Sequence, residues 1–152
     1  MAPSGNGPAR PGAGDTGRSE MEAEHHVQVS LLYALRQAVS GGESENAQEL
    51  LERLTDYSKM HFASEQLLMR LYQYDGFAAH VAEHEDMIEA LESLRAGQEA
   101  ERWIDALDAS LVRHIRGADR ALGHYLAGLA GGGDQPHRLK ARRRLMPAPP
   151  RG

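Results

Sequence analysis

Cysteine is absent from the 152 residues, and aromatic residues make up only 5% of the chain. Without thiolates the chain forms no disulfide, offers no sulfur ligand to a soft metal or an iron–sulfur cluster, and does not reveal its redox compartment. β-branched residues are also sparse. This composition favours helices over sheets, and the chain length suits one domain.

Long apolar runs are missing as well. No stretch approaches the ~20 residues needed to span a bilayer, and the N-terminus lacks the apolar segment of a secretory signal. We therefore expect a cytoplasmic protein without a membrane span.

The net charge of −5 conceals an asymmetry. Residues 21–130 carry nine Lys/Arg and nineteen Asp/Glu, a net charge of −10, whereas residues 131–152 carry +5. The acidic body argues against nucleic-acid binding by the folded domain. The basic end is expected to be a solvated, disordered tail, with a docking segment for an acidic partner, nucleic acid or an anionic lipid surface as the alternative.

The chain divides into three parts by composition. Residues 1–18 are rich in Gly, Pro, Ala and Ser and predict a disordered leader. Residues 19–131 predict the folded domain, and residues 132–152 the basic, Pro-containing disordered tail. Ser19 and Glu22 have the spacing of a capping box and are expected to start the first helix.

Hydrophobic residues spaced three and four apart predict four amphipathic helices. The first ends at Gly41-Gly42, the second runs from a cap at Ser44 to about 74–76, the third runs from Phe77 to near Gly97, and the fourth covers about 98–129. Val29 and Trp103 are among the residues expected to point inward. The short connections predict an all-α, antiparallel up-down four-helix bundle.

Every predicted helix carries histidine, and residues four apart share a helix face. Folding the helices antiparallel brings five imidazoles and two carboxylates to one level of the core. A lone histidine on such a face is more often a hydrogen-bonded core residue. Seven buried polar groups without a metal would each cost ~1–3 kcal/mol. The set comprises His25, His61, Glu65, His80, His84, His114 and Asp119.

Seven ligands exceed the needs of one ordinary metal ion and fit two ions that share the carboxylates. Imidazole and carboxylate without thiolate favour iron, manganese, copper or zinc. A ferritin-like site would need two Glu-x-x-His pairs, and only Glu22-x-x-His25 is present. The sequence therefore predicts a two-metal site of another kind in the core.

The spacing of His114 and Asp119 poses a geometric difficulty. Five residues apart on an α-helix, they point ~140° away from each other. Either the metals lie between the two edges of a broad stripe, or a π-bulge widens the turn. The sequence does not decide between these arrangements.

Four stretches resemble the hemerythrin family, and bacterial single-domain hemerythrins most closely, over roughly residues 21 to 130. They are His25 after an acidic run, His61-Phe62-x-x-Glu65-x-x-Leu68-Met69, His80-x-x-x-His84, and His114-Ile115-x-x-x-Asp119. The resemblance implies two irons bridged by Glu65, Asp119 and an oxo or hydroxo group. It also implies that one iron is held by His80, His84 and His114, and the other by His25 and His61.

By the same resemblance, one iron has an open position for dioxygen, which implies reversible oxygen binding for storage, delivery or sensing. Leu111 and Ile115 are expected to form a dry apolar wall over that position. Bacterial hemerythrins often carry tryptophan where this chain has Ser110, which predicts a wetter pocket that Trp103 could partly fill.

Two other functions stay open. One is a di-iron enzyme, acting as a peroxidase, an oxidase or a nitric-oxide-reducing centre, with Tyr57, Tyr72 or Tyr125 relaying electrons. The other is an oxygen or redox signalling module that acts through the basic tail.

Overall fold

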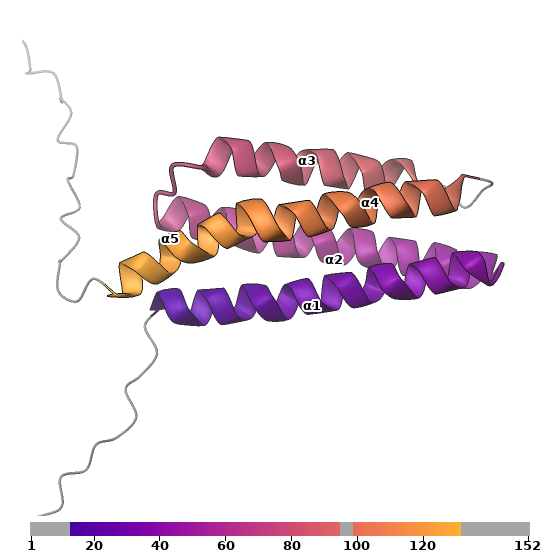
Figure 1. Cartoon of the computed structure of the whole chain (residues 1–152), viewed down its shortest axis with the longest axis horizontal. Helices are drawn as coiled ribbons and strands as arrows, with labels where there is room; N and C mark the ends of the chain where they lie inside the picture. Colours follow the sequence, from indigo (N-terminus) through magenta and orange to yellow (C-terminus); the bar gives the residue numbers. More distant parts are fainter. Residues whose placement is uncertain (1–12, 95–98, 132–152) are drawn as a thin grey trace, which may run out of the picture.

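The computed structural model describes residues 13–94 and 99–131, and within these ranges every regular element is a helix. The helical elements form four rods, and Figure 1 shows each rod running antiparallel to the one before it in sequence. α1 packs against both α2 and the last rod, which closes the bundle. The predicted all-α, antiparallel up-down bundle is confirmed. Its elements are α1 (Ala13–Ser40), α2 (Ser44–Leu71), α3 (Phe77–Ser93) and a final rod of α4 (Ala100–His114), η1 (Ile115–Asp119) and α5 (Arg120–Gly131).

The core consists of two hydrophobic clusters. Leu54, Phe62 and Leu111 belong to the larger cluster, and Met69 and Leu122 to the smaller one. On α2, Glu65 lies between Phe62 of the larger cluster and Met69 of the smaller one, and His61 precedes Phe62. On the last rod, His114 and Asp119 lie between Leu111 and Leu122. The polar layer is therefore enclosed by apolar packing at both ends.

Two helix ends are closed by left-handed residues. Gly42 has φ +71°, and the N–H of Glu43 donates to the carbonyl of Ala38 at 2.9 Å, as in a Schellman motif. The predicted end of the first helix at Gly41-Gly42 is confirmed. α2 ends at Leu71, earlier than expected, where Gln73 adopts φ +54°.

The predicted start of the first helix was wrong. α1 begins at Ala13 rather than at Ser19. Adding residues to the end of a formed helix costs far less than nucleating one, and no proline interrupts residues 13–18. The expected domain limit at residue 19 thus falls inside a helix. Residues 1–12 and 132–152, which hold most of the predicted leader and the whole tail, lie outside the described residues.

Two inward positions were also assigned wrongly. Val29 is 42% exposed and Trp103 is 48% exposed, whereas Gln28 and Ile104 are buried. Each error is a shift of one residue, about 100° around the helix. The buried spacing on α1 runs through Gln28, and on α4 it runs through Ile104, so the two expected residues lie beside the stripe.

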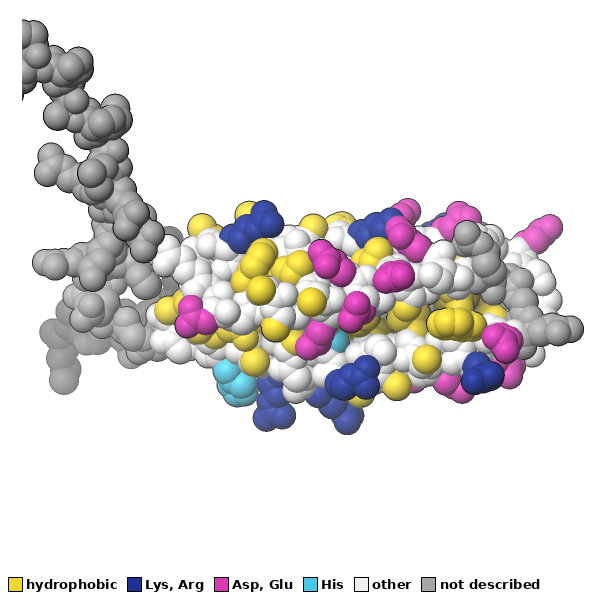
Figure 2. Space-filling model, turned by 90° about the horizontal axis from the view of Figure 1, so that it is seen from above, with side chains coloured by type: hydrophobic (Ala, Val, Ile, Leu, Met, Phe, Trp, Pro, Cys, Tyr) yellow, Lys and Arg dark blue, Asp and Glu magenta, His cyan; other side chains and the backbone are white. Residues whose placement is uncertain are grey.

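The surface does not form a single charged field on the face seen in Figure 2, where Lys, Arg, Asp and Glu are scattered among hydrophobic side chains. None of the helices in residues 13–94 and 99–131 combines the length and apolarity needed to cross a membrane.

Candidate metal centre

The seven residues named from the sequence converge on one layer of the bundle. Each offers one ligand atom, and within each of two groups these atoms lie within 4.8 Å of one another. Both groups contain Glu65 and Asp119. The first adds His80, His84 and His114, and the second adds His25 and His61.

Burial is nearly complete across this layer. All the members except His25 are at most 3% exposed, and the His25 side chain is 12% exposed. Charged and polar groups are rarely buried to this degree unless they pair or bind metal. The second group, which contains His25, is therefore the one closer to solvent.

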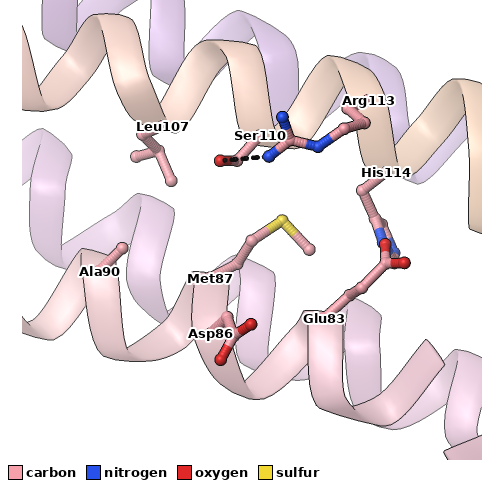
Figure 3. Close-up of a pocket in the computed structure, with 8 residues that line it drawn as sticks. All are labelled: Glu83, Asp86, Met87, Ala90, Leu107, Ser110, Arg113 and His114. Atoms are coloured by element: carbon pink, nitrogen blue, oxygen red, sulfur yellow. Dashed lines mark hydrogen bonds and ion pairs between the residues drawn. The ribbon is translucent and has the colours of Figure 1, made fainter. Parts of the chain in front are cut away.

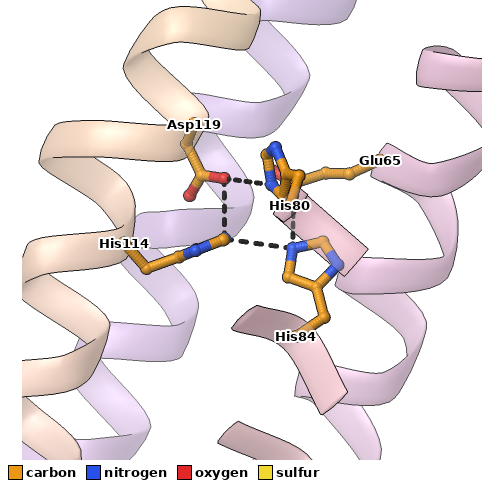
Figure 4. Close-up of side chains that lie close together, drawn as sticks. All are labelled: Glu65, His80, His84, His114 and Asp119. Carbon is orange, nitrogen blue, oxygen red and sulfur yellow. Dashed lines mark hydrogen bonds and ion pairs between the residues drawn. The ribbon is translucent and has the colours of Figure 1, made fainter. Parts of the chain in front are cut away.

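A π-helical turn resolves the difficulty over His114 and Asp119. The five residues from Ile115 to Asp119 form η1, between the α-helical segments α4 and α5. The wider turn brings the fifth residue round to the same face, so Asp119 Oδ1 lies 2.9 Å from Nε2 of His114 (Figure 4). Of the two arrangements that the sequence left open, the structure has the π-bulge, a feature often found at functional sites.

The short distances between side chains in the layer fit ligands that surround one metal ion better than they fit hydrogen-bonded pairs. Nε2 of His80 lies 2.9 Å from Asp119 Oδ1, and Nε2 of His84 lies 2.9 Å from Glu65 Oε2 and 3.0 Å from Nε2 of His114 (Figure 4). Neighbouring ligands ~2.0–2.2 Å from one ion would be about 3 Å apart.

Buried polar atoms without hydrogen-bond partners also indicate a metal site. Among the described residues, ten buried side-chain N and O atoms have no hydrogen-bond partner, and nine of them belong to this layer. They include both carboxylate oxygens of Glu65 and of Asp119. Such orphaned atoms are costly unless a cation satisfies them. The residues therefore fit a pair of metal ions, and both carboxylates belong to both ligand groups.

Two glutamates outside the layer orient its histidines, and the sequence analysis missed them. Glu24 Oε2 lies 2.7 Å from Nδ1 of His61, and Glu83 Oε2 lies 2.6 Å from Nδ1 of His114. A carboxylate on Nδ1 fixes the ring and leaves Nε2 to bind metal. The available signal was Ala-Glu-His, which occurs at 23–25 and again at 82–84.

Contacts within the layer shift the pKa values of its histidines and carboxyl groups. Burial alone would lower the pKa of His25 and of His80, but their contacts with Asp119 and Glu65 outweigh it and raise both to about 9. Burial would raise the pKa values of the two carboxyl groups, but the surrounding histidines hold both well below their usual range. Burial lowers the pKa of His84. Metal must therefore displace protons from histidine on binding.

The three residues expected to shape the oxygen pocket line three different cavities. Leu111 lines a small cavity formed by buried residues inside the bundle. Ile115 lines an outer groove of about 380 Å³ that also contains His25 and Asp119. Ser110 lines a groove of about 260 Å³ between α3 and α4, which reaches Glu83 and His114 (Figure 3).

Aromatic residues close one side of the layer. Phe62 stacks on the His84 ring, with centroids 4.0 Å apart and planes 9° apart. Because Phe62 also belongs to the larger hydrophobic cluster, it separates that cluster from the imidazoles. The Tyr125 hydroxyl donates to the Tyr72 carbonyl at 2.7 Å, next to the smaller cluster.

These features define a metal-binding helical bundle in which two ligand groups share two buried carboxylates. The family model described as "Hemerythrin HHE cation binding domain" matches residues 16–126. The chain belongs to the hemerythrin family, and the composition of the layer fits a metal site.

Curated relatives agree with this assignment. A bacteriohemerythrin of Pseudomonas paraeruginosa is 31% identical over 110 residues, covering 69% of this chain and 72% of the relative. One from Methylococcus capsulatus is 27% identical over 113 residues, covering 68% and 84%. One from Stenotrophomonas maltophilia is 29% identical over 106 residues, covering 66% and 69%. No solved structure gave a significant match.

Proposed function

We propose that this chain is a non-haem di-iron protein that binds dioxygen reversibly. The observation that carries the proposal is the unequal division of histidines, three in one ligand group and two in the other, around shared carboxylates. An ion in the three-histidine group has more protein ligands than its neighbour. The names of the relatives, bacteriohemerythrins, support iron and oxygen as the metal and the ligand.

In this proposal the ligand residues are divided between two irons. His80, His84 and His114 would hold one iron, and His25 and His61 would hold the other and leave a position for an exogenous ligand. Glu65 and Asp119, which belong to both ligand groups, would be shared by the two irons, together with a solvent-derived oxo or hydroxo group. When bound, the iron pair supplies the two electrons that dioxygen takes on binding and returns on release.

Reversible binding requires surroundings without an acid or base that could promote further reaction. The small buried cavity beside the layer has no titratable side chain in its lining, which includes Phe62 and Leu111. Apart from Gln28 and Ser58 this lining is apolar, and a largely apolar, water-poor wall disfavours loss of charged oxygen species. This lining favours a carrier or sensor over the alternative of a di-iron oxidase or peroxidase.

Iron analysis of histidine variants tests the di-iron site. The wild-type protein should hold two irons per chain, and His61→Ala or His84→Ala should lower that number sharply, because each leaves a shared carboxylate unbalanced. His26→Ala is the matched control, since His26 is exposed beside His25. One zinc per chain, or unchanged iron in both variants, would contradict the proposal.

Oxygen titration then tests the function itself. Reduced, iron-loaded protein should take up dioxygen and release it again under vacuum. Irreversible oxidation would favour the enzyme alternative.

A further inference from the structure

Gln28 is a buried polar residue that the metal layer does not use. It is 2% exposed, and its Nε2 donates to Oγ of Ser58 at 2.8 Å. Its Oε1 is the tenth buried atom without a hydrogen-bond partner, and the only one in the described residues outside the metal layer. One end of the amide is therefore anchored and the other end is free.

Gln28, whose Oε1 has no partner, lines the small buried cavity inside the bundle. Each helical rod contributes to this cavity a residue three positions from one of its histidine ligands. The four residues are Gln28, Ser58, Met87 and Leu111. The cavity therefore lies directly beside the metal layer, and its volume of about 10 Å³ is near the minimum for one water-sized group.

Stability does not account for an amide at this position. Most of the cavity lining is apolar, including Leu32, Leu54 and Leu107. A leucine in place of Gln28 would fill a similar volume and leave no unpaired polar atom, whereas an unpaired buried group destabilises the fold. A polar residue that lowers stability next to a binding centre points to a role in binding.

Ser58 can pair with the Gln28 amide in either of its two orientations. A serine hydroxyl both donates and accepts, so it can pair with either end of the Gln28 amide. The assignment of amide oxygen and nitrogen follows from such pairing and reverses if the amide flips. The pair can therefore offer the cavity either a carbonyl acceptor or an N–H donor.

We propose that Gln28, anchored by Ser58, is the polar recognition group for the small ligand of the centre, and hydrogen-bonds the outer atom of a diatomic or triatomic ligand. This inference rests on the proposed function, because it needs an exogenous ligand on the two-histidine side. Gln28 follows His25 by one turn and Ser58 precedes His61 by one turn, which places the pair on that side. The remaining lining is apolar. A single hydrogen bond there therefore contributes more to the difference in affinity between ligands than the same bond in solvent.

Azide, a linear triatomic anion that binds ferric ions, is the probe for this proposal. The oxidised, iron-loaded protein is titrated with azide and followed by absorbance, as wild type, Gln28→Leu and Ser58→Ala. Gln37→Leu is the matched control, because Gln37 is an exposed glutamine on the same helix. Melting temperatures of the metal-free proteins provide a second readout that is independent of iron.

Gln28→Leu should weaken azide binding about tenfold, the effect of losing one hydrogen bond to a charged ligand. Ser58→Ala should weaken it less, because the amide remains but is no longer held. Gln37→Leu should bind azide as the wild type does, and metal-free Gln28→Leu should melt no lower than wild type.

Two results would overturn the inference separately from the proposed function. Azide affinity of Gln28→Leu within twofold of wild type would remove the recognition role. A much lower melting temperature with unchanged azide affinity would show that the amide is structural. Failure of the iron-loaded wild type to bind azide at all would instead remove the open position, and with it the proposed function.

Discussion

Glu83 on α3 reaches across to His114 on the last rod, with its Oε2 2.6 Å from the imidazole Nδ1. The pair joins a side chain that is 52% exposed to one that is 2% exposed. Glu24 and His61 repeat the relationship between α1 and α2. Each ligand group thus has one histidine whose ring is fixed from the surface side by a carboxylate on a neighbouring helix.

Glu83→Gln should weaken iron retention about tenfold, because the amide orients the ring less firmly and makes the imidazole a poorer donor. Glu24→Gln should act in the same direction through His61. Competition with a chelator at fixed pH measures the effect. Glu85→Gln, on an exposed face of the same helix, is the control and should retain iron normally. Equal retention in all three variants would remove the orienting role.

The metal-free protein should lose stability as the pH is raised from about 6.5 to about 9. Contacts with Asp119 and Glu65 raise the folded-state pKa of His25 and His80 to about 9, above the unfolded value of 6.5. A raised pKa gives stability that is complete below the unfolded value and is lost as pH passes the folded value. Thermal melts after chelation measure it, and iron-loaded protein should lose far less. A melting temperature that rises over this interval in chelated protein would contradict the assignment.

Ser110→Trp should prolong the oxygenated form. Ser110 lines the groove between α3 and α4 that reaches His114 (Figure 3), where tryptophan would add ~150–250 Å² of contact and displace water. Trp103, 48% exposed, does not line this groove. The measurement is the decay of the oxygenated absorbance at equal pH without added anions, with Ala109→Trp as an exposed control. An unchanged or shorter lifetime would show that Ser110 does not control access.

Much of the site could be predicted because helix periodicity is local. The i, i+4 pairs of α2 and α3 place both members on one face whatever the rest of the chain does, so His61 with Glu65 and His80 with His84 followed from spacing alone. The short connection of residues 41–43 likewise indicated an antiparallel neighbour.

The remaining features depend on contacts between helices. The π turn at η1 reconciles Asp119 with His114, and the sequence permitted but did not require it. Glu24 and Glu83 act on histidines of other helices, so no spacing within one helix reveals them. Gln28 was overlooked because a polar residue is expected on the exposed face, and only the packing shows it inside.

Reversible binding of dioxygen at the metal centre is the property that distinguishes the proposed function from a di-iron enzyme. The direct measurement is an anaerobic titration of the reduced, iron-loaded protein with dioxygen, followed by degassing and a second titration. We expect uptake of about one dioxygen per iron pair, a new visible absorbance that disappears under vacuum, and the same uptake in the second cycle. Immediate irreversible oxidation, with peroxide released or a substrate consumed and no uptake in the second cycle, would contradict it.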